Sequence, residues 1–366
     1  VQEATDWASS GVDPLKFTRS YASSFGLLKA PTYSRLGNAW RSNFDAAASW
    51  MGSLGSPVAL PTSATTIHIV LPDSIEYSFK QQTGVWKPVI PRPHPTSTAS
   101  IYWDQFRTDI DLKLTITAST VEMVTPEGTR YIFGFDGLLK QITFVDGYAQ
   151  YLEYSGILNT RVTDSFGRWL EFAYDTPASL PSLLSKVITS DGKTIDFTYE
   201  NRAIGLPSGF YNPSIYALKS VVYPDATPAV STDNPTLTYE YLNDAEQPFL
   251  MTGVVDERGI RHVTWTFDSN GRVLTNERAG GMAHFTFAYD DVNNKVTVTN
   301  PLGRQTVYSY QRIQGQIRRL TAVDGISTAN CAASNTVYAY DTNGFRSQAT
   351  DAKRRITKWT RNSRGL

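Results

Sequence analysis

The sequence contains few of the residues that most catalytic and metal sites use. Its 366 residues include one cysteine and four histidines. Cys331 alone cannot form an intrachain disulfide, and with no histidine near it in the sequence we interpret it as a loop residue. His68, His94, His262 and His284 do not match any common metal-ligand spacing. We therefore expect no metal site, no cofactor and no catalytic residue of these types.

The chain is also poor in charge. Charged residues make up 19% of it, and the formal net charge is zero, so we do not expect nucleic acid as a partner. Residues 301–366 are an exception, with eleven Lys and Arg against three Asp and Glu, a balance of +8. We weigh a chance distribution against a contact with an acidic neighbour. The absence of any apolar run near the roughly 18 residues of a membrane helix predicts no membrane span.

Aromatic residues, in contrast, reach 12%, with 20 Tyr, 17 Phe and 8 Trp. Aromatic side chains pack well across pleated strands, so this composition favours broad sheets. Period-2 alternation supports the same interpretation: Val263, Trp265 and Phe267 alternate with Thr264 and Thr266, which places the apolar set on one face. The sequence predicts an all-β chain with almost no helix, built as a long antiparallel sheet of successive hairpins.

One pattern recurs from about residue 119 onward. An Asp or Asn leads within three residues to a Gly, often followed by a basic residue, and then to an alternating strand that ends near Tyr or Phe. We expect the glycines to provide tight repeat turns, at Gly128, Gly167, Gly192, Gly259, Gly271, Gly303 and Gly344. In a degenerate last copy, Arg354 stands where Gly is expected.

Six Asp-Gly or Asn-Gly pairs lie between these strands. Such pairs favour two-residue type I′ turns, and we predict them at residues 136–137, 146–147, 191–192, 270–271, 324–325 and 343–344. Proline-rich residues 88–95 are predicted to be a loop, because proline cannot donate to a strand ladder. Two further loops are predicted at residues 205–209 and 224–235.

One cluster of carboxylates could have a catalytic role. Asp104, Asp109 and Asp111 lie near Trp103 and Phe106, a combination that suits sugar handling. A glycosidase needs two carboxyl groups facing each other across a cleft, and the sequence does not place them there. The alternative is a polar strand edge, and we expect the chain not to be an enzyme.

Two groups of residues together resemble a known family. FDSNGRVL (residues 267–274) and YDTNGF (residues 340–345) resemble the YD repeat of bacterial RHS proteins. Near the start, DPLKFTRSY (residues 13–21) and LGNAWRSNFD (residues 36–45) are similar to the segment that opens the RHS region. The resemblance implies an N-terminal β region at residues 1–118 and a YD-repeat sheet at residues 119–366.

In this family the sheet spirals into a hollow shell around a toxin domain. The chain has no evident closing segment, Asp-Pro-x-Gly self-cleavage motif or trailing toxin domain, so we expect a curved, partial shell or spiral, truncated at its C-terminal end. The resemblance implies a non-catalytic scaffold, secreted or at the cell surface, that encloses or presents a cargo polypeptide or its own C-terminal continuation. The alternative function is a carbohydrate- or surface-binding module that uses exposed aromatic residues.

Overall fold

The computed structural model confirms the predicted fold class, a nearly all-β chain built of antiparallel strands. It describes residues 2–23, 35–51, 59–73, 75–93, 101–106, 110–175, 182–202, 215–225, 227, 233–244, 247–313, 317–329, 332–342 and 344–361. The structure describes two 3₁₀ turns in full, η3 (Pro61–Ser63) and η4 (Ala279–Gly281), and no α-helix within these residues. The predicted loop at residues 205–209 lies outside this set, as do parts of 224–235.

The chain forms two compact units. Unit 1 comprises residues 1–86 and 113–262, and unit 2 comprises residues 87–112 and 263–366. The predicted division at residues 118/119 stays a prediction. The strands of unit 1 are β1 (Gln2–Ala8), β2 (Lys16–Tyr21), β3 (Trp40–Ser42), β4 (Ala47–Met51), β5 (Thr66–Val70), β6 (Glu76–Gln82), β9 (Lys113–Ile116), β10 (Thr120–Val124), β11 (Arg130–Gly134), β12 (Leu139–Thr143), β13 (Ala149–Ser155), β14 (Leu158–Asp164), β15 (Trp169–Asp175), β16 (Leu183–Thr189), β17 (Thr194–Arg202), β18 (Ile215–Val222), β19 (Thr236–Tyr241) and β20 (Met251–Val255).

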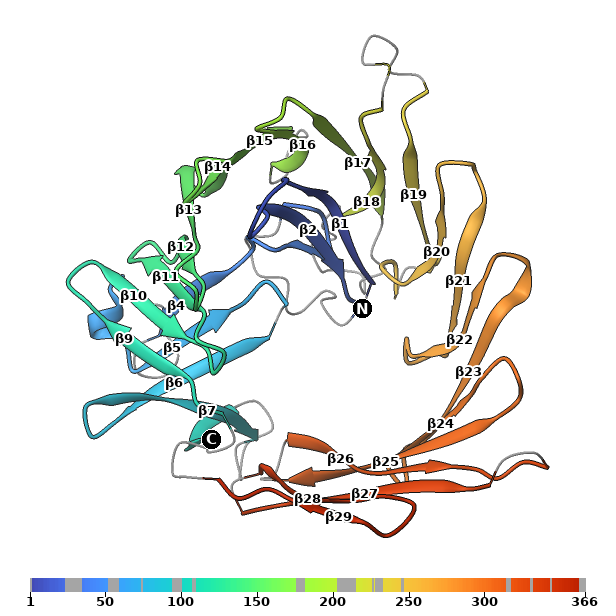
Figure 1. Cartoon of the computed structure of the whole chain (residues 1–366). Coiled ribbons are helices and arrows are strands. Elements are labelled where there is room, and N and C mark those ends of the chain that lie inside the picture. The colour runs from blue at the N-terminus through green and yellow to red at the C-terminus, as the bar shows by residue number, and fades with distance from the viewer. Residues whose placement is uncertain are drawn as a thin grey trace, which may run out of the picture. The chain divides into compact units, whose positions relative to one another are not determined.

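Two strands cross the limits of the units, β7 (Val85–Pro93) and β21 (Arg261–Phe267). The remaining strands belong to unit 2 and are β8 (Ile101–Phe106), β22 (Val273–Arg278), β23 (Met282–Asp290), β24 (Lys295–Thr299), β25 (Gln305–Ile313), β26 (Ile317–Gly325), β27 (Ser334–Tyr340), β28 (Arg346–Thr350) and β29 (Ile356–Lys358). Sequence neighbours pair antiparallel along β9–β20 and along β21–β29 (Figure 1).

The prediction of a loop at residues 88–95 is wrong for its first part. The backbone of β7 pairs with β8, with Val89 opposite Phe106 and Pro93 opposite Ile101. The register shifts between Ile90 and Arg92, so Pro91 stands at the irregular point of the ladder. A missing N–H is tolerated at a bulge, which explains how this proline-rich segment still forms a strand.

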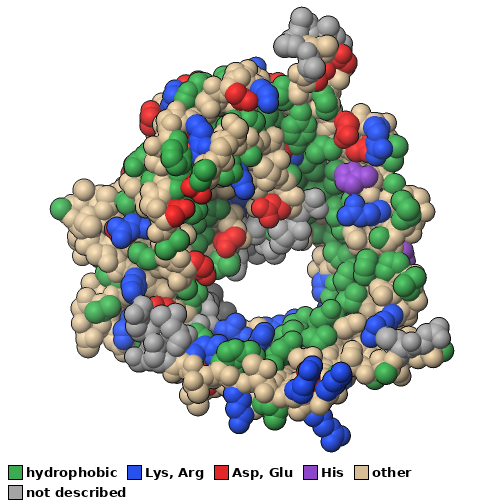
Figure 2. Space-filling view, in the orientation of Figure 1, with side chains coloured by type: hydrophobic (Ala, Val, Ile, Leu, Met, Phe, Trp, Pro, Cys, Tyr) green, Lys and Arg blue, Asp and Glu red, His purple; other side chains and the backbone are tan. Residues whose placement is uncertain are grey.

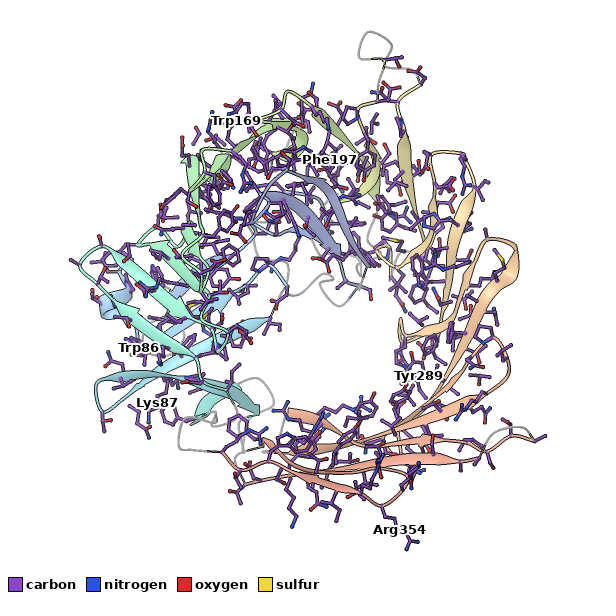
Figure 3. The ribbon with its side chains drawn as sticks, viewed as in Figure 1. Trp86, Lys87, Trp169, Phe197, Tyr289 and Arg354 are labelled. Atoms are coloured by element: carbon purple, nitrogen blue, oxygen red, sulfur yellow. The ribbon has the colours of Figure 1, made fainter. Side chains whose placement is uncertain are left out.

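In unit 1, a separate three-stranded sheet β1-β2-β3 packs on one face of β15–β20. Phe17 of β2 lies between Phe172 of β15 and Phe197 of β17, with ring centroids 5.9 Å apart in both pairs. Trp40 of β3 contacts Tyr239 of β19 at 4.8 Å. Phe17, Phe197, Trp40 and Tyr239 are buried between the two sheets. Figure 1 shows the strands of both sheets, and Figure 3 labels Phe197 on β17.

Candidate functional site

The turns between the repeat strands share one hydrogen-bond pattern. At residues 164–168 the Gly167 N–H donates to the Asp164 carbonyl oxygen (3.0 Å), and the Asp164 N–H donates to the Arg168 carbonyl oxygen (2.9 Å). The Asp164 carboxylate accepts from the N–H groups of Phe166 and Arg168 and from Arg168 Nε at 2.7 Å. The leading Asp therefore satisfies the turn's backbone donors and holds the arginine that follows.

Every predicted repeat-turn glycine described above has a positive φ. The values are +90° for Gly128, +80° for Gly167, +78° for Gly192, +74° for Gly259, +73° for Gly271, +76° for Gly303 and +82° for Gly344. Each of these N–H groups donates to the carbonyl oxygen three residues earlier. In the degenerate copy, Arg354 adopts the same conformation, with φ +61°, and makes the same bond to Asp351.

The predicted type I′ turns are wrong in type. Type I′ requires positive φ at both central residues, and Asp136, Asp146, Asp191 and Asn270 do not have it. The loop instead has three residues with a single left-handed glycine, which is the type I turn with a G1 bulge. Asp324-Gly325 is not a turn, because Gly325 pairs with Thr306 and Ser334 inside the sheet. Asn343 lies outside the described residues.

A second repeated feature is a chain of tyrosine hydroxyl groups. Tyr199 of β17 donates its hydroxyl proton to the Leu184 carbonyl oxygen of β16 at 2.6 Å, and Leu184 stands opposite Tyr174, the tyrosine of the preceding repeat. Tyr241 in turn donates at 2.7 Å to Leu218, which stands opposite Tyr199. The same relation holds for Tyr174 with Asn159 and Tyr340 with Leu320, and for Tyr289 with Val273, which stands opposite Phe267 in place of a tyrosine.

We call this repeated contact the tyrosine ladder. Its physical reason is a bulge: in each hairpin that provides an acceptor carbonyl, the register shifts at the aromatic residue, for example between Thr198 and Tyr199. A bulge takes one residue out of the backbone ladder, and a buried carbonyl then needs another donor. Burial raises the pKa of Tyr174, Tyr199 and Tyr241 above its ordinary value, so each hydroxyl keeps the proton that it donates.

The ladder tyrosines share a face with the aromatic residue two positions earlier. We call this face of the repeat sheet the tyrosine face. Its pairs are Phe172/Tyr174, Phe197/Tyr199 and Tyr239/Tyr241 in unit 1, and Trp265/Phe267, Phe287/Tyr289, Tyr308/Tyr310 and Tyr338/Tyr340 in unit 2.

In unit 1 the tyrosine face is covered by the β1–β3 sheet. Trp40 Nε1 donates to the Tyr241 hydroxyl at 2.8 Å. The Tyr21 hydroxyl donates to the Phe249 carbonyl oxygen (2.5 Å) and accepts from the Met251 N–H (2.9 Å). Polar groups of the covering sheet thus form hydrogen bonds with the repeat strands, and these bonds fix the position of one sheet on the other.

The interface contains a fully buried ion pair. Arg19 Nε lies 2.6 Å from Asp6 Oδ2 with both side chains inaccessible to solvent, and the Tyr223 hydroxyl donates to Asp6 Oδ1 at 2.5 Å. The guanidinium also lies 4.9 Å from the Trp40 ring and 5.1 Å from the Tyr239 ring. Burial disfavours its charge, but the Asp6 carboxylate outweighs burial, so the pKa of Arg19 is raised.

A repeat-turn arginine secures the loop between β1 and β2. Arg168, which is held by Asp164, donates through Nη1 to the carbonyl oxygens of Ser10 (2.9 Å) and Val12 (3.2 Å) and through Nη2 to that of Asp13 (2.5 Å). The sequence identified Arg168 as part of a repeat turn but gave no signal for these long-range contacts.

Beside this loop lies a pocket of about 640 Å³ in unit 1. Its walls combine one lysine, Lys16, with four carboxylates and three aromatic rings, those of Asp13, Asp73, Glu127, Asp146, Tyr131, Phe144 and Tyr148. Burial, with the nearby Asp73, Tyr77 and Glu127, raises the pKa of Tyr131 to about 12. Such a lining is compatible with a cationic group.

Within the described residues, the structure does not bring together the carboxylates that we considered for sugar chemistry, Asp104, Asp109 and Asp111. Asp111 is half-buried just before β9, Asp109 lies outside the described residues, and only the backbone of Asp104 is described, in β8. Cys331 and His94 also lie outside. In the described part of the chain, no group of three His, Cys, Asp or Glu side chains could hold a metal ion, and no helix there is long and apolar enough to cross a membrane.

Comparison with known proteins finds similar solved structures only at low TM-scores. No family model and no curated protein matches the chain. Among solved structures, the Tc holotoxin pore of Photorhabdus luminescens is 10% identical over 84% of this chain and 20% of that one, with a TM-score of 0.27. The TcdB2-TccC3 structure is 9% identical over 97% and 23%, with a TM-score of 0.24.

A porin-like protein from Bacteroides uniformis is 9% identical over 67% of this chain and 90% of that one, with a TM-score of 0.19. The chain spans about a fifth of the length of the toxin structures that it matches.

Proposed function

We propose that the chain is a non-catalytic, RHS-type scaffold whose repeat sheet encloses or presents a cargo polypeptide, such as a toxin or the continuation of its own chain, outside the bacterial cell. One observation carries the proposal: in unit 1, the tyrosine face of the repeats is covered by a polypeptide layer, β1–β3, through rings and hydrogen bonds. A sheet must bury its apolar face against another layer, and here that layer is a sequence-distant segment.

The contacts of the aromatic rings support a scaffold over a carbohydrate-binding module. Sugar stacking needs a free aromatic face, whereas here cationic side chains cover several of them. Arg161 lies over Trp169 (4.5 Å), and Lys140 lies over Tyr154 (4.8 Å). Further pairs are Arg272 with Tyr289, Arg318 with Tyr310 and Arg346 with Tyr338.

The experiment that tests the proposal is a protease-protection assay. An unstructured, protease-sensitive reporter is fused after residue 366 of the full chain and, as a control, to an unrelated β-protein of similar size. A scaffold that encloses polypeptide lengthens the reporter's half-life in protease relative to the control. Equal half-lives overturn enclosure.

Two further outcomes would replace the proposal. Binding of the full chain to a glycan array would favour the carbohydrate-binding module. Hydrolysis of a polysaccharide that is lost on Asp104→Asn or Asp109→Asn would make the chain an enzyme.

A further inference from the structure

The tyrosine face of unit 2 differs from that of unit 1 in its burial. Between residues 263 and 361, none of the described hydrophobic side chains is buried. Trp265, Phe287, Tyr308 and Tyr338 are all only half-buried. The same repeat face that a polypeptide layer covers in unit 1 therefore carries no such layer over these residues, which is an unusual state for a row of aromatic side chains.

The two faces of β21–β29 also differ in charge. Strand register assigns each residue to a face, because residues directly opposite each other share one. Tyr340 pairs with Arg346, and Val263 pairs with Arg278. Arg312 and Arg318 pair with each other, two positions along from Tyr310.

Among the paired, described residues of these strands, every charged side chain on the tyrosine face is therefore an arginine. The opposite face is mixed. It carries Glu277, Asp290, Lys295 and Asp324, with many threonines between them. The basic excess of residues 301–366 is thus partly gathered among the aromatic rings, and Figure 2 shows Lys and Arg beside hydrophobic side chains over these strands.

Two of these arginines lie against rings of the same face. Arg318 lies 4.6 Å from the Tyr310 ring, and Arg346 lies 4.3 Å from the Tyr338 ring. Both side chains are exposed. A partner that covers the rings would also meet the guanidinium groups, and burying them without a carboxylate is costly.

We infer that the tyrosine face of unit 2 is the docking surface for an acidic polypeptide segment, one that alternates apolar side chains with Asp or Glu. The inference rests on the proposed function and names the chemistry of the cargo. Unit 1 provides a partial precedent, since the layer that covers its tyrosine face presents the Asp6 carboxylate to the Tyr223 hydroxyl of the repeat sheet.

The test uses the full chain and labelled synthetic peptides of about ten residues, the upper length of ordinary strands. One peptide alternates Val or Phe with Glu, a second replaces Glu by Lys, and a third replaces it by Ser. Fluorescence anisotropy measures Kd at low and high salt. The inference expects the Glu peptide to bind most tightly, with an affinity that falls as salt rises.

Paired variants locate the binding. R318Q/R346Q removes two charges from the tyrosine face, and K295Q/K358Q removes two from the opposite face as a matched control. Exposed ion pairs contribute about 0.2–1 kcal/mol each, so the first variant should weaken binding of the Glu peptide about two- to thirtyfold and the control should not. Hydrogen exchange should show new protection in β25–β28.

Equal weakening by both variants, or tighter binding of the Lys peptide, overturns the inference. Tighter binding of single-stranded DNA than of the Glu peptide assigns the face to nucleic acid instead and also overturns it. If the Ser peptide binds as well as the Glu peptide while the fused reporter is still protected, the acidic preference fails and enclosure stands. If no peptide binds and the reporter is cleaved, both fail.

Discussion

The buried Asp6–Arg19 pair provides the sharpest test of how the β1–β3 layer is held. Asp6 accepts from Arg19 Nε (2.6 Å), Arg19 Nη2 (2.9 Å) and the Tyr223 hydroxyl (2.5 Å), and neither partner of the pair is solvent-accessible. Asp6→Asn keeps the volume but removes the charge. Because arginine cannot neutralise itself, the variant leaves a charged guanidinium buried without its carboxylate.

Removing one partner of a buried ion pair lowers the free energy of unfolding by about 3–5 kcal/mol. We expect Asp6→Asn to lower it by that amount. The matched control is Asp196→Asn, which breaks the pair with Lys186 (3.4 Å) in the same unit. Both of those side chains are more than 40% exposed, so the cost should stay under about 1 kcal/mol. Replacing both buried partners, as in Asp6→Leu with Arg19→Met, should recover most of the loss.

The assay is equilibrium unfolding of the full chain in guanidinium chloride, followed by tryptophan fluorescence. Trp7 and Trp40 report on the covering layer directly, since both are buried. The reasoning is refuted if Asp6→Asn unfolds at the same midpoint as Asp196→Asn. A double variant as unstable as Asp6→Asn would show that packing, and not the unpaired charge, causes the loss.

The remaining predictions concern backbone conformation and pH. Gly137 and Gly147 both have positive φ, but a Cβ on Gly137 would lie 2.3 Å from the Ala48 carbonyl oxygen, whereas a Cβ on Gly147 would have no atom within 4 Å. Gly137→Ala should therefore lower the melting temperature clearly more than Gly147→Ala. Equal shifts would contradict the close approach of Gly137 to Ala48. Arg354→Gly should relieve a left-handed backbone and stabilise unit 2 by about 1 kcal/mol, measured by calorimetry; no gain would mean that the positive φ is unstrained. Burial raises the pKa of Tyr199 in the folded state, so its contribution to stability is complete below the unfolded-state pKa near 10 and is lost as pH rises further, by up to about 1.4 kcal/mol per pH unit. Unfolding titrations between about pH 9 and 12 should therefore show a smaller loss of stability per pH unit in Tyr199→Phe than in the unsubstituted chain. An equal loss per pH unit in the two proteins would show that Tyr199 ionises in the folded state.

Much of the fold could be predicted from local patterns. The alternation of Val263, Trp265 and Phe267 fixes one face of β21, and the glycine of each Asp-x-x-Gly run stands in a left-handed turn. The turn type could not be derived from the dipeptide alone. Asp-Gly and Asn-Gly suit several turns, and the dipeptide does not indicate that the loop has three residues. Among these dipeptides only the two Asn-Gly pairs have a leading Asp three residues before the glycine, and the carboxylate of one of them, Asp268, binds two N–H groups of the turn that follows it.

The docking of the N-terminal layer was beyond sequence reasoning. Nothing in DPLKFTRSY indicates that Arg19 pairs with Asp6 or that Phe17 contacts rings more than 150 residues away, since those contacts depend on how successive hairpins place their aromatic residues in space. The tyrosines of the ladder were visible as repeat ends. Their hydroxyl bonds were not, because the acceptor carbonyl is exposed by a bulge that the sequence does not mark.

The tyrosine ladder has a consequence for how such chains change in length. Along the repeats, each bond of the ladder joins a hairpin to the one before it, as Tyr241 to Leu218 and Tyr199 to Leu184 show. A hairpin inserted as a complete pair of strands would bring its own tyrosine and its own acceptor carbonyl, whereas a single added strand would leave one of the two without its counterpart. Growth and loss by whole hairpins is therefore the change that this architecture tolerates without rebuilding its neighbours.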